Sequence, residues 1–122
     1  LGLAVLCWTA GFDILYSCQD YEFDRRECLH SVPARFGIKA ALRLTWLLHA
    51  CTILCLIGVG ISFSLGPVFY AGVVIIGLFL WYENSIVSAD DLSRLNVSFF
   101  TVNGFVSICA FVFTFVSVNF HL

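Results

Sequence analysis

The longest stretch of this sequence without Asp, Glu, Lys or Arg runs from residue 44 to residue 82. A membrane-crossing helix needs about 20 apolar residues, so this stretch is too long for one crossing and matches two. It is interrupted at residues 62–67, where small polar residues precede Gly66 and Pro67, a pattern typical of a turn and a new helix start. We therefore predict two membrane-spanning helices, over about residues 39–61 and about residues 67–83.

Composition extends the membrane assignment to the whole chain. Hydrophobic residues make up 61% of the 122 positions and charged residues 11%, and no soluble single domain of this size is that apolar. Two further apolar segments predict helices over about residues 1–23 and about residues 97–120, giving an all-α, multi-pass transmembrane bundle of about four helices. Because the sequence has no Met and begins inside an apolar segment, we expect further N-terminal helices of the same protein ahead of Leu1.

The basic residues predict how the bundle is oriented. In a four-helix arrangement they all fall on one side of the membrane, and by the positive-inside rule that side is cytoplasmic. A bacterial inner membrane or its equivalent is the expected location. A net charge of −2 without a clustered basic face argues against nucleic acid, which leaves the lipid bilayer as the expected surroundings. The basic residues are Arg25, Arg26, Arg35, Lys39, Arg43 and Arg94.

Carboxylates interrupt the first apolar segment near its end. Read as one helix, Asp13, Asp20 and Asp24 are spaced by seven and four residues, steps that return to within about 20° of one direction. The three carboxylates then form a stripe, with Tyr16 and Glu27 close to it. Like charges repel and ionising Asp13 beside the membrane is costly, so Mg²⁺ is the expected cofactor. The alternative is an acidic turn beside the membrane that faces water.

Basic and aromatic residues near this stripe point to a ligand. Arg35 and Lys39 could neutralise a diphosphate held by Mg²⁺. If the diphosphate is allylic, its departure leaves a cation that aromatic rings can stabilise through their π faces, although Trp and Tyr near helix ends also serve as interface anchors. The candidate rings by position are Tyr16, Tyr21, Trp81 and Tyr82.

Other polar residues carry weaker signals. The three histidines, at positions 30, 49 and 121, share no ligand spacing, so no chemistry is assigned to them. Residues 83–96 are expected to form a polar loop. Three asparagines, Asn84, Asn96 and Asn103, are interpreted as helix–helix hydrogen-bonding groups. The six cysteines show no metal-ligand spacing and are interpreted as packing residues, without disulfides or a transition metal.

A family resemblance is carried by the segment from Asp13 to Asp24 together with residues 29–33 and 36–39. These residues resemble the second aspartate-rich motif of the UbiA superfamily of intramembrane prenyltransferases. Within it, the likeness is to the 4-hydroxybenzoate polyprenyltransferase group and its menaquinone-pathway relatives. Residues 90–96, with the pairs at 99–100 and 103–104, also resemble that group, so the likeness covers essentially the whole chain.

The resemblance implies a nine-helix all-α fold, of which this chain would supply the C-terminal four helices. It implies that Asp20 and Asp24 are metal–diphosphate ligands, that Asp13 belongs to the same catalytic site, and that Arg35 and Lys39 contact the diphosphate. The expected reaction joins a polyprenyl diphosphate to a hydroxylated aromatic acid, either 4-hydroxybenzoate for ubiquinone or a dihydroxynaphthoate for menaquinone. The family's first aspartate-rich motif is absent from these residues, so this fragment alone is expected to be inactive.

Two other classes of protein are compatible with the same carboxylates. A transporter or channel subunit could use them to carry ions, since intramembrane ionisable residues often mark ion paths. Against this, the carboxylates cluster at one membrane end, and no charged residue continues the path through residues 44–82. A purely structural membrane subunit would tolerate neutralisation of all three.

Overall fold

The computed structural model describes residues 1–88, 90–93 and 96–122, and every regular element in this part of the chain is helical. The four long elements are helices α1, α4, α5 and α6, and the short π-helical segment η2 directly precedes α6. Three short elements, η1, α2 and α3, connect α1 to α4. In chain order the bounds are α1 Gly2–Ser17, η1 Cys18–Asp20, α2 Tyr21–Arg26, α3 Val32–Phe36, α4 Ile38–Ser62, α5 Pro67–Ser85, η2 Val97–Val102 and α6 Asn103–Phe120.

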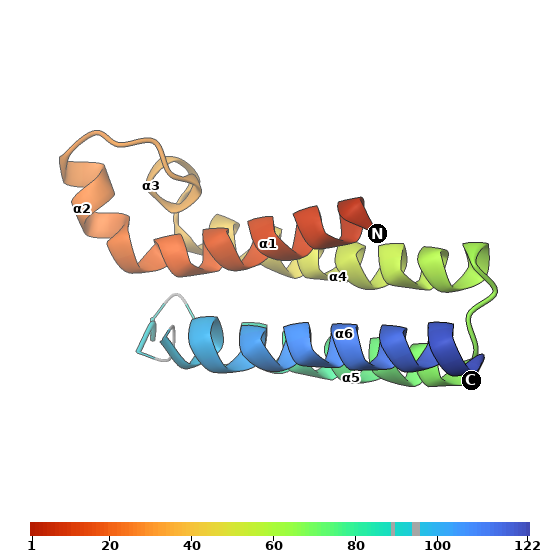
Figure 1. The fold of residues 1–122 in the computed structure, drawn as a ribbon. Helices are drawn as coiled ribbons and strands as arrows, with labels where there is room; N and C mark the ends of the chain where they lie inside the picture. Colours follow the sequence, from red (N-terminus) through yellow and green to blue (C-terminus); the bar gives the residue numbers. More distant parts are fainter. Residues whose placement is uncertain (89, 94–95) are drawn as a thin grey trace.

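The long helices form two adjacent pairs (Figure 1). Helix α1 packs along α4, helix α5 packs along α6, and α4 joins the two pairs through its contacts with α5. Helices α2 and α3 and the α5–α6 connection lie at one end of the bundle, whereas both termini and the α4–α5 turn lie at the other end. The expected all-α, multi-pass arrangement is confirmed.

Three segments are long and apolar enough to cross a membrane: Ile38–Ser62, Pro67–Ser85 and Phe100–Phe120. Helix α1, the fourth predicted crossing, has 16 residues. At 1.5 Å per residue it is about 24 Å long, shorter than the roughly 30 Å hydrocarbon core of a bilayer. By length and composition, three of the described segments could each cross a membrane, and α1 packs along the first of them, α4.

The predicted helix over residues 1–23 is divided at Ser17. The Ser17 hydroxyl donates a 2.7 Å hydrogen bond to the carbonyl of Ile14, the group that the Cys18 amide would use in a continuous α-helix. The Cys18 amide donates instead to Leu15, three residues back, and residues Cys18–Asp20 form a 3₁₀ turn. A 3₁₀ turn winds about 20° more per residue than an α-helix. The carboxylates of Asp13 and Asp20 are therefore rotated apart relative to the straight stripe that the spacing predicts.

Two prolines begin helices. Pro67 is the first residue of α5, where a helix start is predicted. The residue before a proline is disfavoured in an α-helix, yet α3 begins at Val32 and holds Pro33 in its first turn, where a missing amide hydrogen costs little. The Ser31 hydroxyl accepts from the Ala34 amide and caps this helix at 3.2 Å.

Two buried clusters hold the bundle together. The larger one joins α1, α4, α5 and the η2–α6 segment through residues such as Ala4, Leu56, Ile76 and Val106. The smaller one lies at the acidic end and consists of Leu15, Cys18, Ala41 and Val87. Because Val87 follows α5 and Cys18 precedes α2, the smaller cluster brings the α5–α6 connection against the base of the acidic segment.

Candidate functional site

The three candidate carboxylates lie at one end of the bundle, on successive elements. Asp13 is exposed on α1, Asp20 is exposed at the end of η1, and Asp24 is half-buried on α2. Within the described residues, none of the three carboxylates accepts a side-chain hydrogen bond or joins an ion pair. Their oxygens are thus available to a ligand that approaches this end of the bundle.

Two of the predicted site residues, Asp24 and Arg35, line one open cavity of about 360 Å³ between α2 and α3. Arg25 and His30 line the same cavity, so it carries one carboxylate, two guanidinium groups and an imidazole. The Arg35 guanidinium lies 5.5 Å from the centre of the Phe36 ring and is exposed. A cavity with this mixture of charges can hold an anion through its arginines while offering a carboxylate to a cation.

The remaining predicted residues lie outside that cavity. Lys39 is exposed in the first turn of α4, and Tyr16 is half-buried on α1. Of the candidate rings, Tyr21 accepts a 2.9 Å hydrogen bond from Arg25 at its hydroxyl, and Trp81 and Tyr82 are exposed near the end of α5. The structure therefore brings Asp24 and Arg35 to one cavity, whereas Asp13, Asp20 and Lys39 do not line it.

The α5–α6 connection is predicted to share this membrane face, and the structure places it at the same end (Figure 1). Asp90 is exposed there, and Asp91 accepts hydrogen bonds from both the amide and the hydroxyl of Ser93. Arg94, which contributes to the predicted orientation, lies outside the described residues.

A second polar group is buried between the helices and includes His49, for which the sequence predicts no chemical role. The amide Nδ2 of Asn84 lies 2.7 Å from Nδ1 of His49, and Oε2 of Glu83 lies 3.9 Å from the same nitrogen. On the neighbouring helices, the indole Nε1 of Trp8 donates to Oδ1 of Asn103 at 3.1 Å. The predicted helix–helix role is confirmed for Asn84 and Asn103, whereas the partners on α1 and α4 were missed.

The position of Glu83 and Asn84 corrects the predicted loop over 83–96. Helix α5 continues to Ser85, and both side chains are buried, with Glu83 0% and Asn84 5% exposed. Asn84 is held there by its 2.8 Å bond to the Leu80 carbonyl and by His49. A polar residue at a helix end faces inward when a buried partner on another helix compensates for its desolvation.

Comparison with known protein families identifies the family of this chain. The model of the UbiA prenyltransferase family matches residues 1–116, nearly the whole chain. The chain belongs to the UbiA prenyltransferase family. The family resemblance carried by the acidic segment is thereby confirmed.

Curated members of the UbiA family share parts of this sequence. A protein named 4-hydroxybenzoate octaprenyltransferase from Francisella tularensis subsp. novicida is 39% identical over 77 residues, which cover 63% of this chain and 27% of that protein. One of the same name from Yersinia pseudotuberculosis is 27% identical over 89 residues, covering 73% of this chain and 31% of that protein. The chain thus spans about a third or less of these relatives, and no solved structure matches it.

The carboxylates of this UbiA chain are of the type that binds Mg²⁺, but the described residues do not surround a metal ion by themselves. Carboxylate oxygens are the ligands that Mg²⁺ prefers, and those of Asp13, Asp20 and Asp24 are not engaged by other described side chains. Among the described residues, however, no three His, Cys, Asp or Glu side chains gather closely enough to hold a metal ion. A metal ion bound here would complete its coordination with diphosphate oxygens, with water or with groups from other parts of the protein, as Mg²⁺ commonly does.

Proposed function

We propose that the protein is an aromatic polyprenyltransferase and that this chain supplies one acidic half of its active site. In the proposed reaction, the allylic carbon–oxygen bond of a polyprenyl diphosphate breaks, diphosphate leaves, and the prenyl carbon bonds to a ring carbon of a hydroxylated aromatic acid, which loses a proton. The observation that carries the proposal is the set of unengaged carboxylates, beside Arg35, at one end of an apolar bundle.

The proposed roles follow from the positions of these residues. Asp20 and Asp24 would hold Mg²⁺ against the diphosphate, with Asp13 completing the acidic side, and Arg35 and Lys39 would contact the diphosphate oxygens. When bound, the metal would supply charge neutralisation to the departing diphosphate. Since the five described basic residues lie on α2, on α3 and in the first two turns of α4, we also propose that the site faces the cytoplasm.

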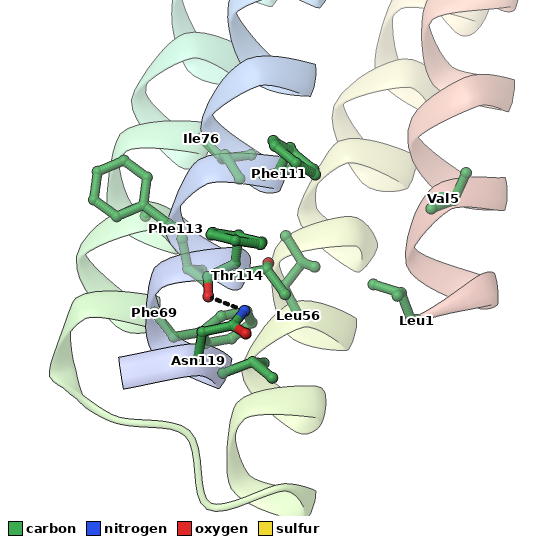
Figure 2. Close-up of a pocket in the computed structure, with 14 residues that line it drawn as sticks. Leu1, Val5, Leu56, Phe69, Ile76, Phe111, Phe113, Thr114 and Asn119 are labelled. Atoms are coloured by element: carbon green, nitrogen blue, oxygen red, sulfur yellow. Dashed lines mark hydrogen bonds between the residues drawn. The ribbon is translucent and has the colours of Figure 1, made fainter. Parts of the chain in front are cut away.

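A cavity in the bundle is suited to the hydrocarbon chain of the polyprenyl diphosphate. A space of about 470 Å³ lies between the helices towards the end that holds the termini, and nearly all its lining residues are hydrophobic. Figure 2 shows Leu1, which precedes α1, and Val5 of α1 on one side of it and Phe111 of α6 on the other, with Leu56 of α4 between them. A polyprenyl chain whose diphosphate lies at the acidic end could run along α1 into this cavity, where burial of hydrocarbon is favourable.

The acceptor is proposed by analogy with the named relatives. Two of them are called 4-hydroxybenzoate octaprenyltransferase, which favours 4-hydroxybenzoate and ubiquinone synthesis. A dihydroxynaphthoate acceptor for menaquinone remains the second candidate, since the described residues do not distinguish the two rings.

The test of these roles is Asp20→Asn in the full-length protein. We expect the rate of prenyl transfer to fall by at least about a hundredfold, since the change removes a charged metal ligand but keeps the side chain's size. Glu22→Gln is the matched control, because Glu22 is an exposed carboxylate two residues away. Equal rates in Asp20→Asn and wild type, at equal protein amounts, would show that the carboxylate has no role in transfer.

A further inference from the structure

Helix α1, which carries Asp13, is fixed to α4 through its own backbone. The buried hydroxyl of Thr45 lies 3.3 Å from the carbonyl oxygen of Gly11 and 3.0 Å from that of Ala41. Thr45 is 0% exposed, so no water competes for this hydroxyl. The contact ties the backbone of α1, two residues before Asp13, to the first half of α4.

Gly11 also provides the space that the His49 ring occupies. A Cβ atom added to Gly11 would lie 2.5 Å from both Cδ2 and Nε2 of His49, a separation that carbon atoms do not adopt. The ring therefore rests directly on the backbone of α1. Its Nε2 faces the same helix near the backbone of Trp8, without forming a hydrogen bond of standard geometry.

The His49 ring is in turn anchored from the opposite side by α5. One hydrogen of the Asn84 amide goes to the Leu80 carbonyl at 2.8 Å, and the other is directed to Nδ1 of His49 at 2.7 Å. Since Nδ2 can only donate, Nδ1 accepts, and the proton of the neutral ring lies on Nε2, towards α1. His49 is thus held between Asn84 and Gly11 and links α5 to α1 through α4.

A separate contact ties α1 to α6. The indole of Trp8 donates to Oδ1 of Asn103 at 3.1 Å, and Asn103 is 8% exposed. Trp8 and Gly11 are three residues apart and therefore neighbours on the surface of α1, so α6 and α4 contact the same turn of this helix. Water is scarce at this depth, and a displaced helix would leave these groups without partners.

We infer that this group of buried contacts, which we call the α1 anchor (Trp8, Gly11, Thr45, His49, Asn84 and Asn103), sets the rotation and axial position of α1 and so places Asp13 for metal–diphosphate binding. The inference rests on the proposed function. Asp13 lies one half-turn beyond Gly11, at a rise of about 3 Å, so a shift of α1 at Gly11 is passed to Asp13 undiminished. The anchor residues are positioning residues and touch no ligand themselves.

The first test is Gly11→Ala in the full-length protein, compared with Gly58→Ala. The added methyl group at Gly11 meets the anchored His49 ring, whereas one at Gly58 on α4 meets nothing within 4 Å. Mn²⁺ is the probe, and its binding in detergent is measured by electron paramagnetic resonance. We expect Gly11→Ala to weaken Mn²⁺ binding by about tenfold, the loss typical when the groups that orient metal ligands are changed, and Gly58→Ala to leave it unchanged.

A second pair of variants covers the case in which Gly11→Ala does not fold. Trp8→Phe removes the indole donor to Asn103 and shortens the ring, and Trp46→Phe makes the same chemical change at an exposed indole of α4. We expect weaker Mn²⁺ binding in Trp8→Phe alone. Wild-type Mn²⁺ affinity in a folded Gly11→Ala protein, or equal affinities in the Trp pair, would overturn the positioning role. Failure of the wild type to bind Mn²⁺ would instead overturn the proposed metal site and the inference with it.

Discussion

At the scale of single residues, the most consequential contact is the one between His49 and Asn84. Truncating Asn84 to Ala leaves Nδ1 of a 3% exposed imidazole without its donor. We expect Asn84→Ala to lower the free energy of unfolding by about 1–2 kcal/mol, as measured by detergent-titrated unfolding. Asn119→Ala is the control, because Asn119 is exposed and its amide donates only within its own helix, to Phe115. Equal losses in the two variants would mean that the buried contact adds nothing.

The residue types in the sequence predict part of this group of buried polar contacts. An Asn inside an apolar helix predicts an interhelical hydrogen bond, and the structure confirms it for Asn84 and Asn103. Their partners could not be predicted, because His49 and Trp8 are 35 and 95 positions away and share no spacing with them. The sequence predicts Glu83 in a loop, because a charged residue beside a polar segment is typical of loops. The burial of the Glu83 side chain depends instead on contacts between helices.

At the scale of helices, the close packing of α5 against α6 depends on Gly72. A Cβ atom added there would lie 2.6 Å from Cγ of Phe113, so the two helices would have to separate. We expect Gly72→Ala to destabilise the bundle by about 1–3 kcal/mol. At Gly77, on the same helix, an added Cβ would make ordinary contact with Ile53 at 3.6 Å, so Gly77→Ala should cost far less. Thermal unfolding of the two variants compares them, and a larger loss in Gly77→Ala would contradict this packing.

The sequence predicts where the helices lie more accurately than it predicts whether each helix is continuous. The uncharged stretch and Gly66-Pro67 predict helices over about 39–61 and about 67–83, and the structure has Ile38–Ser62 and Pro67–Ser85. The acidic segment was predicted as one helix because its apolar and acidic spacing fits the α-helical period. At the break, the Ser17 hydroxyl and the Cys18 thiol both donate to the backbone carbonyl of Ile14, and hydrophobic periodicity does not detect such a competition.

At the scale of the whole molecule, the structure places opposite chemistry at opposite ends of the bundle. Asp13, Asp20 and Asp24 belong to α1, η1 and α2, and α2 lies with α3 at one end of the bundle (Figure 1). The apolar cavity is lined by residues near both termini, among them Leu1, Val118 and Asn119. An amphiphilic donor with an anionic head and a hydrocarbon tail matches this division. No Asp, Glu, Lys or Arg side chain, which a path for cations would favour, is among the described residues that line this cavity.

We propose that these helices belong to an enzyme that transfers a polyprenyl group. One measurement tests this transfer directly. Membranes carrying the full-length protein are supplied with a labelled polyprenyl diphosphate and either 4-hydroxybenzoate or a dihydroxynaphthoate, with and without EDTA. We predict a labelled prenylated acceptor and one diphosphate released per product, both abolished by EDTA. No product from either acceptor, together with cation flux through reconstituted liposomes in the absence of any prenyl donor, would contradict the account.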